Sequence, residues 1–427
     1  MSILRKDYEI SVWNDVWESG KFVEKRLGII GSNSMSYEGR AIEPNFSRNV
    51  NGVKKLSFKM YKYFIDPITG EKALNPFVNW LVSERKVKLK YEKCINQEGK
   101  EVLAIAENES FVFAEVDQLG QMTHKDYLPY HVNEVLQLPL VDVEAIKKRN
   151  FTVAIDCVNS VGGLAIPAML KALGVTNIIE LYCEPNGQFP HNPEPLPQHL
   201  TEISELLKQG KADLGFVVDP DVDRLAIICE DGSMFGEEYT LVSIADYILA
   251  HTPGNTVSNM SSSRALSDIT RKHGGEYTAS AVGEVNVVAQ MQKVNAIIGG
   301  EGNGGVIYPA CHSGRDALVG VALFLSHMAK MDMTVSAYRQ TLPEYYISKN
   351  RIDLTPDTDI DAILARVKDI YKEERVNDID GVKIDFAEGW VHLRKSNTEP
   401  IIRVYSEAAT MDKANALAQQ VMAIINE

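Results

Sequence analysis

Short apolar runs alternate with longer amphipathic segments over the last two thirds of this 427-residue chain. Residues 151–156, 177–183 and 214–218 have the length and composition of buried strands, and helical patterns at residues 164–173 and 201–209 separate them. A strand, a glycine-containing turn and a helix in this order are typical of a βαβ unit. The alternation therefore predicts an α/β domain in this region.

The pattern repeats once and then changes. Strands at residues 255–259 and 296–298, with a helix at residues 263–273 between them, predict a second α/β domain. After Pro343 the order of elements is that of a small α+β domain. Its expected helix, three strands and second helix are residues 360–371, 382–386, 390–394, 401–405 and 411–425.

The first hundred residues differ from the rest in both charge and texture. They hold 18 Lys and Arg against 12 Asp and Glu, although the whole chain has a net charge of −14. The alternation at residues 56–64 and 82–91 is typical of strands with one buried face. Residues 27–33 could form a strand that enters a glycine turn, but they lack the third glycine of a dinucleotide-binding fingerprint. We therefore expect a β-rich domain of unknown role, in which no catalytic constellation is visible.

The composition argues against several functions. No stretch approaches the ~18–20 apolar residues of a membrane span, and the first residues lack the apolar core of a secretory signal. The five cysteines are widely spaced and form no Cys-x-x-Cys pair, which favours a reducing, cytoplasmic location over a disulfide framework or a thiolate zinc site. The negative net charge argues against a nucleic-acid partner. Oligomeric state leaves no signal in the sequence.

Asp219-Pro-Asp-Val-Asp-Arg224 is the strongest site signal. It places Asp219, Asp221 and Asp223 at alternate positions after an apolar strand, so that their carboxylates can converge in a tight loop. Such oxygen ligands suit a hard divalent cation, and Mg²⁺ typically keeps room for water and a substrate phosphate. The alternative is an acidic surface turn between two strands. The apolar flanks favour the metal site, because they hold the loop on a rigid scaffold.

Two further loops have compositions suited to ligands. Residues 299–305 contain five glycines, which let a backbone approach a ligand closely, and Glu301 and Asn303 could hydrogen-bond hydroxyl groups. A glycine-rich loop without a ligand is at least as good an interpretation. Residues 394–400, with Arg403 beyond them, offer charged, hydroxyl and amide donors suited to phosphate, although a charged hairpin turn fits equally well. His191, in a proline-rich loop, is as compatible with a structural role as with a functional one.

Together these motifs resemble those of the α-D-phosphohexomutase superfamily, which includes phosphoglucomutase, phosphomannomutase and phosphoglucosamine mutase. An Asp-x-Asp-x-Asp-Arg loop, a Gly-Gly-Glu loop and an Arg-x-Ser-x-Thr-Glu-Pro loop follow one another in the family's order. The resemblance implies two α/β mutase-type domains and a C-terminal α+β domain, preceded here by the β-rich domain. The implied divisions are residues 1–100 (β-rich), 101–145 (remnant of the first mutase domain and linker), 146–250 (α/β domain with the metal loop, residues 219–224), 251–345 (α/β domain with the sugar loop, residues 299–305) and 346–427 (α+β domain with the phosphate loop, residues 394–400).

The resemblance also implies a reaction that moves a phosphoryl group between C1 and C6 of a hexose phosphate through a bisphosphate intermediate. Asp219, Asp221 and Asp223 would hold Mg²⁺, and Arg224 would be a catalytic residue that contacts the phosphoserine or the intermediate. The residues that would bind the sugar and its non-reacting phosphate are Gly283, Glu284, Glu301, Asn303, Arg394, Ser396, Asn397, Thr398 and Arg403.

The chain departs from the family pattern at two places. The sugar loop reads Asn303-Gly-Gly305 where the family often has Ser-Gly-His. The family's phosphoserine string, Thr-Ala-Ser-His-Asn-Pro, does not occur in this sequence, and Thr278-Ala-Ser-Ala281 matches only its first half and follows the metal loop. The β-rich segment stands where the serine-bearing domain belongs.

Three functions follow as hypotheses. The chain is a phosphohexomutase, an isomerase of carbohydrate metabolism; or it is a fusion that binds Mg²⁺ and a phosphosugar but lacks the nucleophile and cannot turn over. In the third, it is a structural or binding protein that acts through its N-terminal β domain. The third gives no reason for three carboxylates to stay together, so it ranks last.

Overall fold

The computed structural model describes residues 12–18, 21–28, 42–48, 54–60, 63–65, 72–74, 96–108, 124–353, 360–395 and 401–426. The chain divides into two compact units. The first comprises residues 1–127, 159–161 and 184–190, and the second comprises residues 128–158, 162–183 and 191–427.

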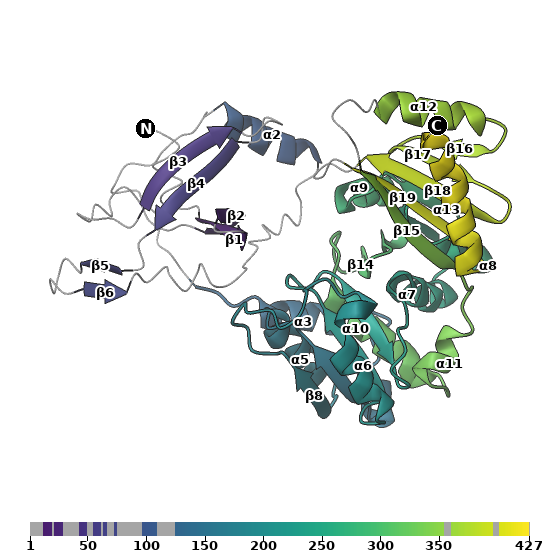
Figure 1. Ribbon diagram of the computed structural model, residues 1–427. Coiled ribbons are helices and arrows are strands. Elements are labelled where there is room, and N and C mark those ends of the chain that lie inside the picture. The colour runs from purple at the N-terminus through teal and green to yellow at the C-terminus, as the bar shows by residue number, and fades with distance from the viewer. Residues whose placement is uncertain are drawn as a thin grey trace. The chain divides into compact units, whose positions relative to one another are not determined.

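In the first unit the described strands form three antiparallel pairs that precede a helix (Figure 1). These elements are β1 (Val12–Glu18) with β2 (Lys21–Gly28), β3 (Ile42–Arg48) with β4 (Lys54–Met60), β5 (Tyr63–Ile65) with β6 (Lys72–Leu74), and α2 (Asn96–Glu107). The strand expected at residues 56–64 is divided between β4 and β5. The strand expected at residues 82–91 and the turn expected at residues 29–33 lie outside the described residues.

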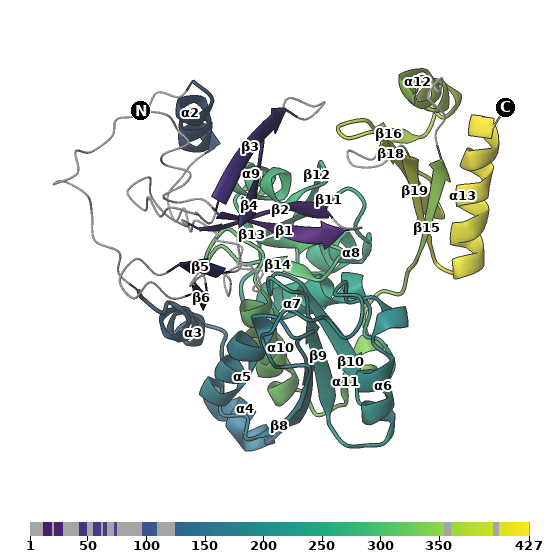
Figure 2. The same ribbon diagram turned by 60° about the vertical axis from the view of Figure 1, so that its left-hand side comes forward.

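The second unit begins with an α/β domain whose sheet has the strand order β10-β9-β7-β8. Strand β7 pairs in parallel with both of its neighbours, and β10 runs antiparallel to β9. Helix α6 lies beside this sheet (Figure 2). Its Ile203 and Leu207 pack against apolar side chains of the sheet. The elements are α3 (Leu128–Leu136), α4 (Val143–Arg149), β7 (Thr152–Asp156), α5 (Gly162–Ala172), β8 (Asn177–Leu181), η3 (Pro197–His199), α6 (Thr201–Lys208), β9 (Leu214–Val218) and β10 (Leu225–Cys229).

The next domain has the same sheet topology. Its strand order is β12-β11-β13-β14, with β11 parallel to both neighbours and β14 antiparallel to β13. Val287 and Met291 of α9 pack on Val257 and Ile307 of this sheet. The elements are α7 (Glu237–His251), β11 (Asn255–Asn259), α8 (Ala265–Lys272), β12 (Tyr277–Ser280), α9 (Glu284–Val294), β13 (Ala296–Glu301) and β14 (Gly305–Ile307).

Two helices then lead to the C-terminal domain. Helix α10 (Ala317–Lys330) returns to the first α/β domain, where it packs on α3, α4 and α5, and α11 (Val335–Arg339) follows it. The C-terminal domain is an antiparallel sheet of order β15-β19-β18-β17-β16, with α12 and α13 packed on it. Its elements are β15 (Tyr346–Asp353), α12 (Ile360–Ile370), β16 (Arg375–Asn377), β17 (Val382–Asp385), β18 (Gly389–Lys395), β19 (Ile401–Ala408) and α13 (Met411–Asn426).

The predicted α/β fold class is confirmed, with two α/β domains and a C-terminal α+β domain in the second unit. Strands β7 and β9 lie where apolar runs predicted them, because those runs are buried almost throughout, and β11 lies at the predicted residues although its sequence is mostly polar. Strand β15 was not predicted, since half of the residues along this edge strand are exposed and three of its eight residues are charged. None of the helices in the described part of the chain combines the length and apolar character needed to cross a membrane.

Candidate functional site

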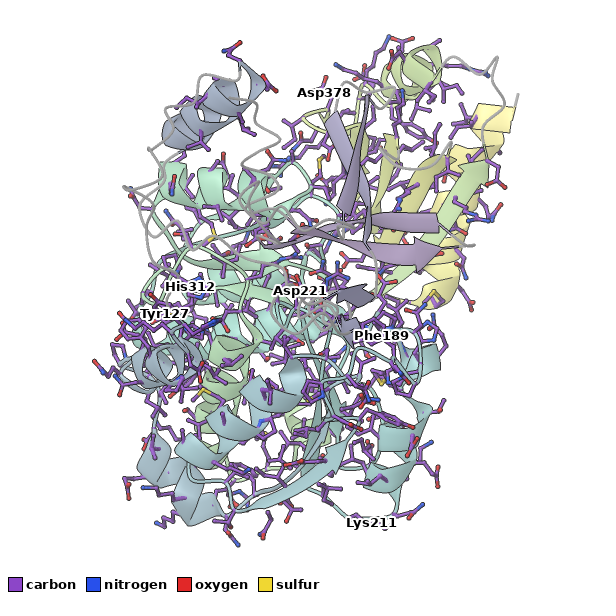
Figure 3. All side chains as sticks on the ribbon, turned by 90° about the vertical axis from the view of Figure 1, so that its left-hand side faces the viewer. Tyr127, Phe189, Lys211, Asp221, His312 and Asp378 are labelled. Carbon is purple, nitrogen blue, oxygen red and sulfur yellow. The ribbon has the colours of Figure 1, made fainter. Side chains whose placement is uncertain are left out.

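The predicted metal loop, residues 219–224, is a tight turn between β9 and β10, at the carboxyl end of β9, and is called the acidic loop below. Figure 3 shows Asp221 and Lys211 at opposite ends of this domain. Asp219 organises the turn, because its Oδ1 accepts hydrogen bonds from the backbone N–H groups of Asp223 and Arg224, both at 3.1 Å. Val222 has a φ of 60°, a conformation that costs a β-branched residue of order 1–3 kcal/mol. Such strain persists where surrounding contacts fix the loop in one shape.

The three carboxylates converge as the alternate spacing predicted. One oxygen from each of Asp219, Asp221 and Asp223 lies within 4.8 Å of the other two. Burial raises the pKa of Asp219 to about 7, and its neighbours Asp223 and Asp221 add to this rise. Within the described residues, the buried Oδ1 of Asp223 accepts no hydrogen bond. A cluster of acceptors with this need for positive charge fits a hard divalent cation.

Arg224 lies at the edge of the acidic loop. Its Nε is 3.5 Å from Asp219 Oδ2, and its Nη1 is 3.5 Å from Oε1 of Glu194 in the proline-rich loop. The same loop contributes His191, whose Nε2 lies 3.0 Å from Oδ2 of Asp156 at the end of β7. The proline-rich loop thus contacts the carboxyl ends of both β7 and β9, and His191 has a clear structural partner.

Glu301 ends β13, and protein donors surround its carboxylate. Its Oε1 accepts hydrogen bonds from Asn259 Nδ2 at 2.9 Å and from the N–H of Gly283 at 3.1 Å. Its Oε2 accepts a hydrogen bond from Arg315 Nη1 at 2.8 Å. Glu301 therefore joins the loop before α9 to the loop after β13, and its predicted role toward sugar hydroxyls stays a prediction.

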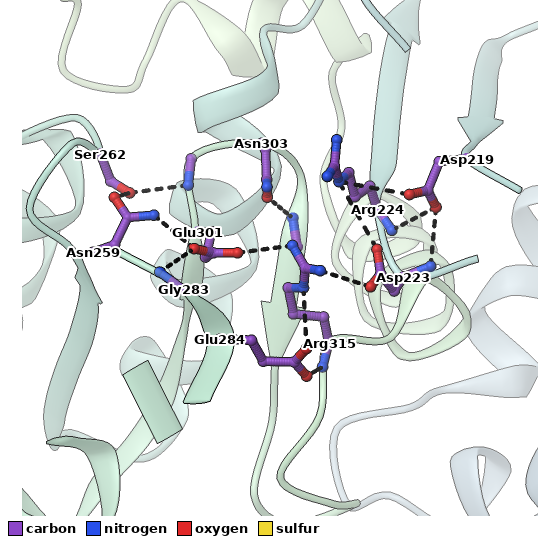
Figure 4. Close-up of polar contacts among 12 residues, drawn as sticks. Asp219, Asp223, Arg224, Asn259, Ser262, Gly283, Glu284, Glu301, Asn303 and Arg315 are labelled. Atoms are coloured by element: carbon purple, nitrogen blue, oxygen red, sulfur yellow. Dashed lines mark hydrogen bonds and ion pairs between the residues drawn. The ribbon is translucent and has the colours of Figure 1, made fainter. Parts of the chain in front are cut away.

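Arg315 connects the acidic loop to the sugar loop (Figure 4). Its Nη2 lies 2.7 Å from Asp223 Oδ2, while its Nη1 binds Glu301. Its backbone N–H donates to Glu284 Oε1 at 2.9 Å, and its Nε lies 3.6 Å from Glu284 Oε2. Sequence reasoning missed this residue. The available signal was a charged Arg-Asp pair directly before the apolar run of α10.

The glycines of the sugar loop allow close contacts inside the protein. A Cβ on Gly304, which has a φ of 88°, would lie 2.5 Å from the backbone oxygen of Leu225, and the Leu225 N–H donates to Gly304 O at 3.0 Å. Asn303 Oδ1 accepts a hydrogen bond from the N–H of Gly305 at 3.2 Å, as in a polar turn. The sugar loop is therefore fitted against β10, directly after the acidic loop.

The predicted phosphate loop is described at Arg394 and Lys395, which end β18, and Arg403 beyond the loop is described in β19. Arg394 of β18 and Arg403 of β19 are register partners, and Arg394 Nε lies 3.1 Å from Asp380 Oδ2. The same Asp380 oxygen accepts a hydrogen bond from the N–H of Val282, beside the sugar loop, at 2.9 Å. Ser396, Asn397 and Thr398 lie outside the described residues.

A second contact joins the C-terminal domain to the preceding one. Ser261 Oγ donates to His392 Nδ1 at 2.8 Å, because His392 Nε2 must carry the proton that it donates to the carbonyl oxygen of Asp380 at 2.7 Å. Burial lowers the pKa of His392 to about 4, so this ring is neutral at pH 7. Residues 278–280, which imitate the family's serine string, lie in β12, where the Ser280 hydroxyl donates to a backbone oxygen.

Comparisons with known proteins agree on one family. Models of phosphoglucomutase/phosphomannomutase match in three parts: α/β/α domain II over residues 129–232, α/β/α domain III over residues 236–346, and the C-terminal domain over residues 354–424. A phosphoglucomutase/phosphomannomutase of Thermococcus kodakarensis is 34% identical over 324 residues, covering 75% of this chain and 70% of the relative. A phosphoglucomutase of Neisseria meningitidis is 30% identical over 336 residues, covering 76% and 70%.

A solved structure shows the same fold. The phosphoglucomutase/phosphomannomutase family protein of Burkholderia thailandensis superimposes with a TM-score of 0.66 and 24% identity, covering 78% of this chain and 70% of that one. The three domain models match consecutive parts of the chain, in the order of the loops described above, and together cover more than half of it. This chain belongs to the phosphoglucomutase/phosphomannomutase family.

Proposed function

We propose that this chain binds Mg²⁺ and a hexose phosphate, and that its fold serves phosphoryl transfer between C1 and C6 of the sugar through a bisphosphate intermediate. The observation that carries the proposal is the convergence of three carboxylates next to an arginine that also binds the sugar-loop carboxylate. Its relatives are named phosphoglucomutase, phosphomannomutase and phosphoglucosamine mutase, which are isomerases.

The carboxylates have distinct duties in this proposal. Backbone N–H groups occupy Asp219 Oδ1, and Arg315 occupies Asp223 Oδ2, whereas the buried Asp223 Oδ1 accepts no hydrogen bond from the described residues and would be a ligand of the cation, together with Asp219 and Asp221. Bound Mg²⁺ would neutralise charge on the transferring phosphoryl group. Arg224, at the edge of the cluster, would bind a phosphoryl oxygen while it contacts Asp219.

The sugar and its second phosphate would be held by the other two loops. Gly283, Glu284 and Asn303 border the Glu301–Arg315 network, and Arg394 and Arg403 form a doubly cationic pair suited to a phosphate dianion. Asp380 links Arg394 to the loop before Gly283, so that the two groups of residues keep a defined spacing. Phosphoryl transfer requires mainly this kind of positioning and charge neutralisation.

Binding without turnover is the second candidate function. The observation that favours it is the lack of the family's Thr-Ala-Ser-His-Asn-Pro string in the sequence. The test is to measure binding of glucose 1-phosphate by calorimetry and its conversion to glucose 6-phosphate in a coupled assay. We expect binding with negligible conversion. Robust conversion, with ³²P trapped on a serine, would rule out the second candidate, and failure to bind would rule out both.

The metal assignment has a separate test. Asp221→Asn should weaken Mg²⁺ binding at least about tenfold, because one of three converging charges is lost, while the free energy of unfolding changes by less than about 1 kcal/mol. Asp378→Asn is the matched control, since this exposed carboxylate pairs with Lys368. An unchanged Mg²⁺ titration of the Asp221 variant would remove the assignment.

A further inference from the structure

A second group of metal-ligating side chains lies at the N-terminal end of α10. His312 and Asp316 come from the segment just before this helix, and His131 comes from α3, far away in the sequence. The Nε2 atoms of both imidazoles lie 2.7 Å from the same oxygen, Asp316 Oδ2. One ring nitrogen of each histidine and the Sγ of Cys311 all lie within 4.8 Å of one another. Four potential ligands from two segments of the chain, far apart in sequence, thus lie close together.

We propose that His131, Cys311, His312 and Asp316 form a tetrahedral site for Zn²⁺ or a similar divalent transition metal. Two imidazoles, a thiolate and a carboxylate are the ligand types that Zn²⁺ takes in proteins, and four is its usual coordination number. The thiolate and the carboxylate together would neutralise the dication, so the filled site would carry no net charge. The acidic loop differs in kind, because it offers only oxygen ligands and suits a hard cation.

The two carboxylate oxygens of Asp316 have different partners, and this arrangement suits such a site. Oδ1 accepts hydrogen bonds from the backbone N–H groups of Leu318 at 2.8 Å and Val319 at 3.2 Å, and so caps α10. Oδ2 is directed to the two imidazoles. The carboxylate is therefore fixed by the helix, with one oxygen left to serve as a ligand.

The hydrogen bonds of His312 indicate which proton must move when a metal binds. His312 Nδ1 accepts the N–H of Gly314 at 3.0 Å, so in the metal-free protein Nε2 carries the proton and donates it to Asp316. Coordination through Nε2 moves this proton to Nδ1, and the Gly314 peptide must turn; a glycine in a loop allows this at small cost. Cys311 must lose its thiol proton, which goes to solvent. Binding should therefore release protons and strengthen as the pH rises.

A filled site would act on Arg315. This arginine, next to Asp316, binds both Asp223 and Glu301. A metal that ties α3 to the segment before α10 would therefore fix the residue that spans the two loops of the proposed active site. We assign the site a structural role, with Arg315 as the positioning residue through which it acts.

The test uses the full chain, stripped with a chelator and dialysed against ZnCl₂ or CoCl₂. We expect one tightly held Zn²⁺ per chain, and a Co²⁺ form with the visible bands of a tetrahedral ion and the near-ultraviolet charge-transfer band of a cobalt thiolate. Cys311→Ser should abolish the charge-transfer band, and His131→Ala with His312→Ala should abolish stoichiometric binding. Cys311→Ser is a mild change that keeps the test valid even if the histidine variant does not fold.

Matched controls separate this site from the rest of the chain. Cys183→Ser and His273→Ala alter a cysteine and a histidine outside the cluster and should retain full Zn²⁺ binding. Asp221→Asn should lose Mg²⁺ affinity and keep Zn²⁺, which makes failure of this proposal distinguishable from failure of the proposed function. Equal Zn²⁺ content in the wild type and the Cys311 and histidine variants would overturn the proposal, as would a Co²⁺ form without a thiolate band.

Discussion

The turns after the third strand of the two α/β domains occupy the same place in the same topology, yet they have opposite designs. In the first domain the β9–β10 turn spans residues 219–224 and carries three carboxylates. In the second domain the β13–β14 turn spans only residues 302–304, which are Gly-Asn-Gly. One turn concentrates charge, and the other minimises bulk.

The two turns therefore make different contributions to the region where they meet. The acidic turn needs positive charge that its own domain does not fully provide, and Arg315 supplies it from the segment after β14. The short turn lets its backbone contact that of β10 at Gly304. The charged turn thus gathers carboxylates, while the glycine turn lies where Glu301 and Arg315 come close to them.

Removing Arg315, which links the two turns, should reduce the free energy of unfolding more than the other changes predicted below. Arg315→Ala leaves Asp223 and Glu301 buried without their cation, which should cost about 3–5 kcal/mol in the free energy of unfolding measured with urea. Arg271→Ala is the control, since its ion pair with Asp268 is exposed and should contribute less than about 1 kcal/mol. A loss below 1 kcal/mol for Arg315→Ala would show that the turns are held together in another way.

The next effect probes the close contact at the short turn. Gly304→Ala places a Cβ about 2.5 Å from a backbone oxygen that cannot rotate away, in addition to a left-handed backbone, and should cost about 3 kcal/mol. Gly210→Ala isolates the backbone cost, because Gly210 has a φ of 70° but nothing within 4 Å of the added Cβ, and should cost about 1 kcal/mol. If urea unfolding shows equal losses of stability for the two variants, the glycine turn accommodates an added Cβ without a clash.

The sequence predicted the acidic turn better than the link that completes it. Asp219, Asp221 and Asp223 are close in sequence, so their convergence follows from local geometry alone. Arg315 lies 92 residues from Asp223, and no local periodicity relates the two. Strands β7 and β9 were visible because burial on both faces makes their runs apolar, whereas α10, apolar all round, gave no helical period to recognise. His131 and His312 likewise meet only in the fold.

The first strands of the two domains extend the comparison, because a histidine meets the carboxyl end of each. His191 contacts Asp156 at the end of β7 and is partly exposed, whereas His392 contacts Ser261 just after β11 and is buried. Burial lowers the pKa of His392 to about 4 from an ordinary value of 6.5.

The low pKa of His392, which contacts Ser261, predicts that the free energy of unfolding decreases in acid. Below pH 6.5 the unfolded chain protonates His392 while the folded protein does not until about pH 4, so stability falls as the pH drops through this window. Between pH 7 and pH 5 the loss should be about 2 kcal/mol. His392→Gln, which retains hydrogen bonding without ionisation, should flatten the pH dependence of urea unfolding by that amount. If this variant keeps the wild-type pH dependence, His392 is not held neutral in the folded protein.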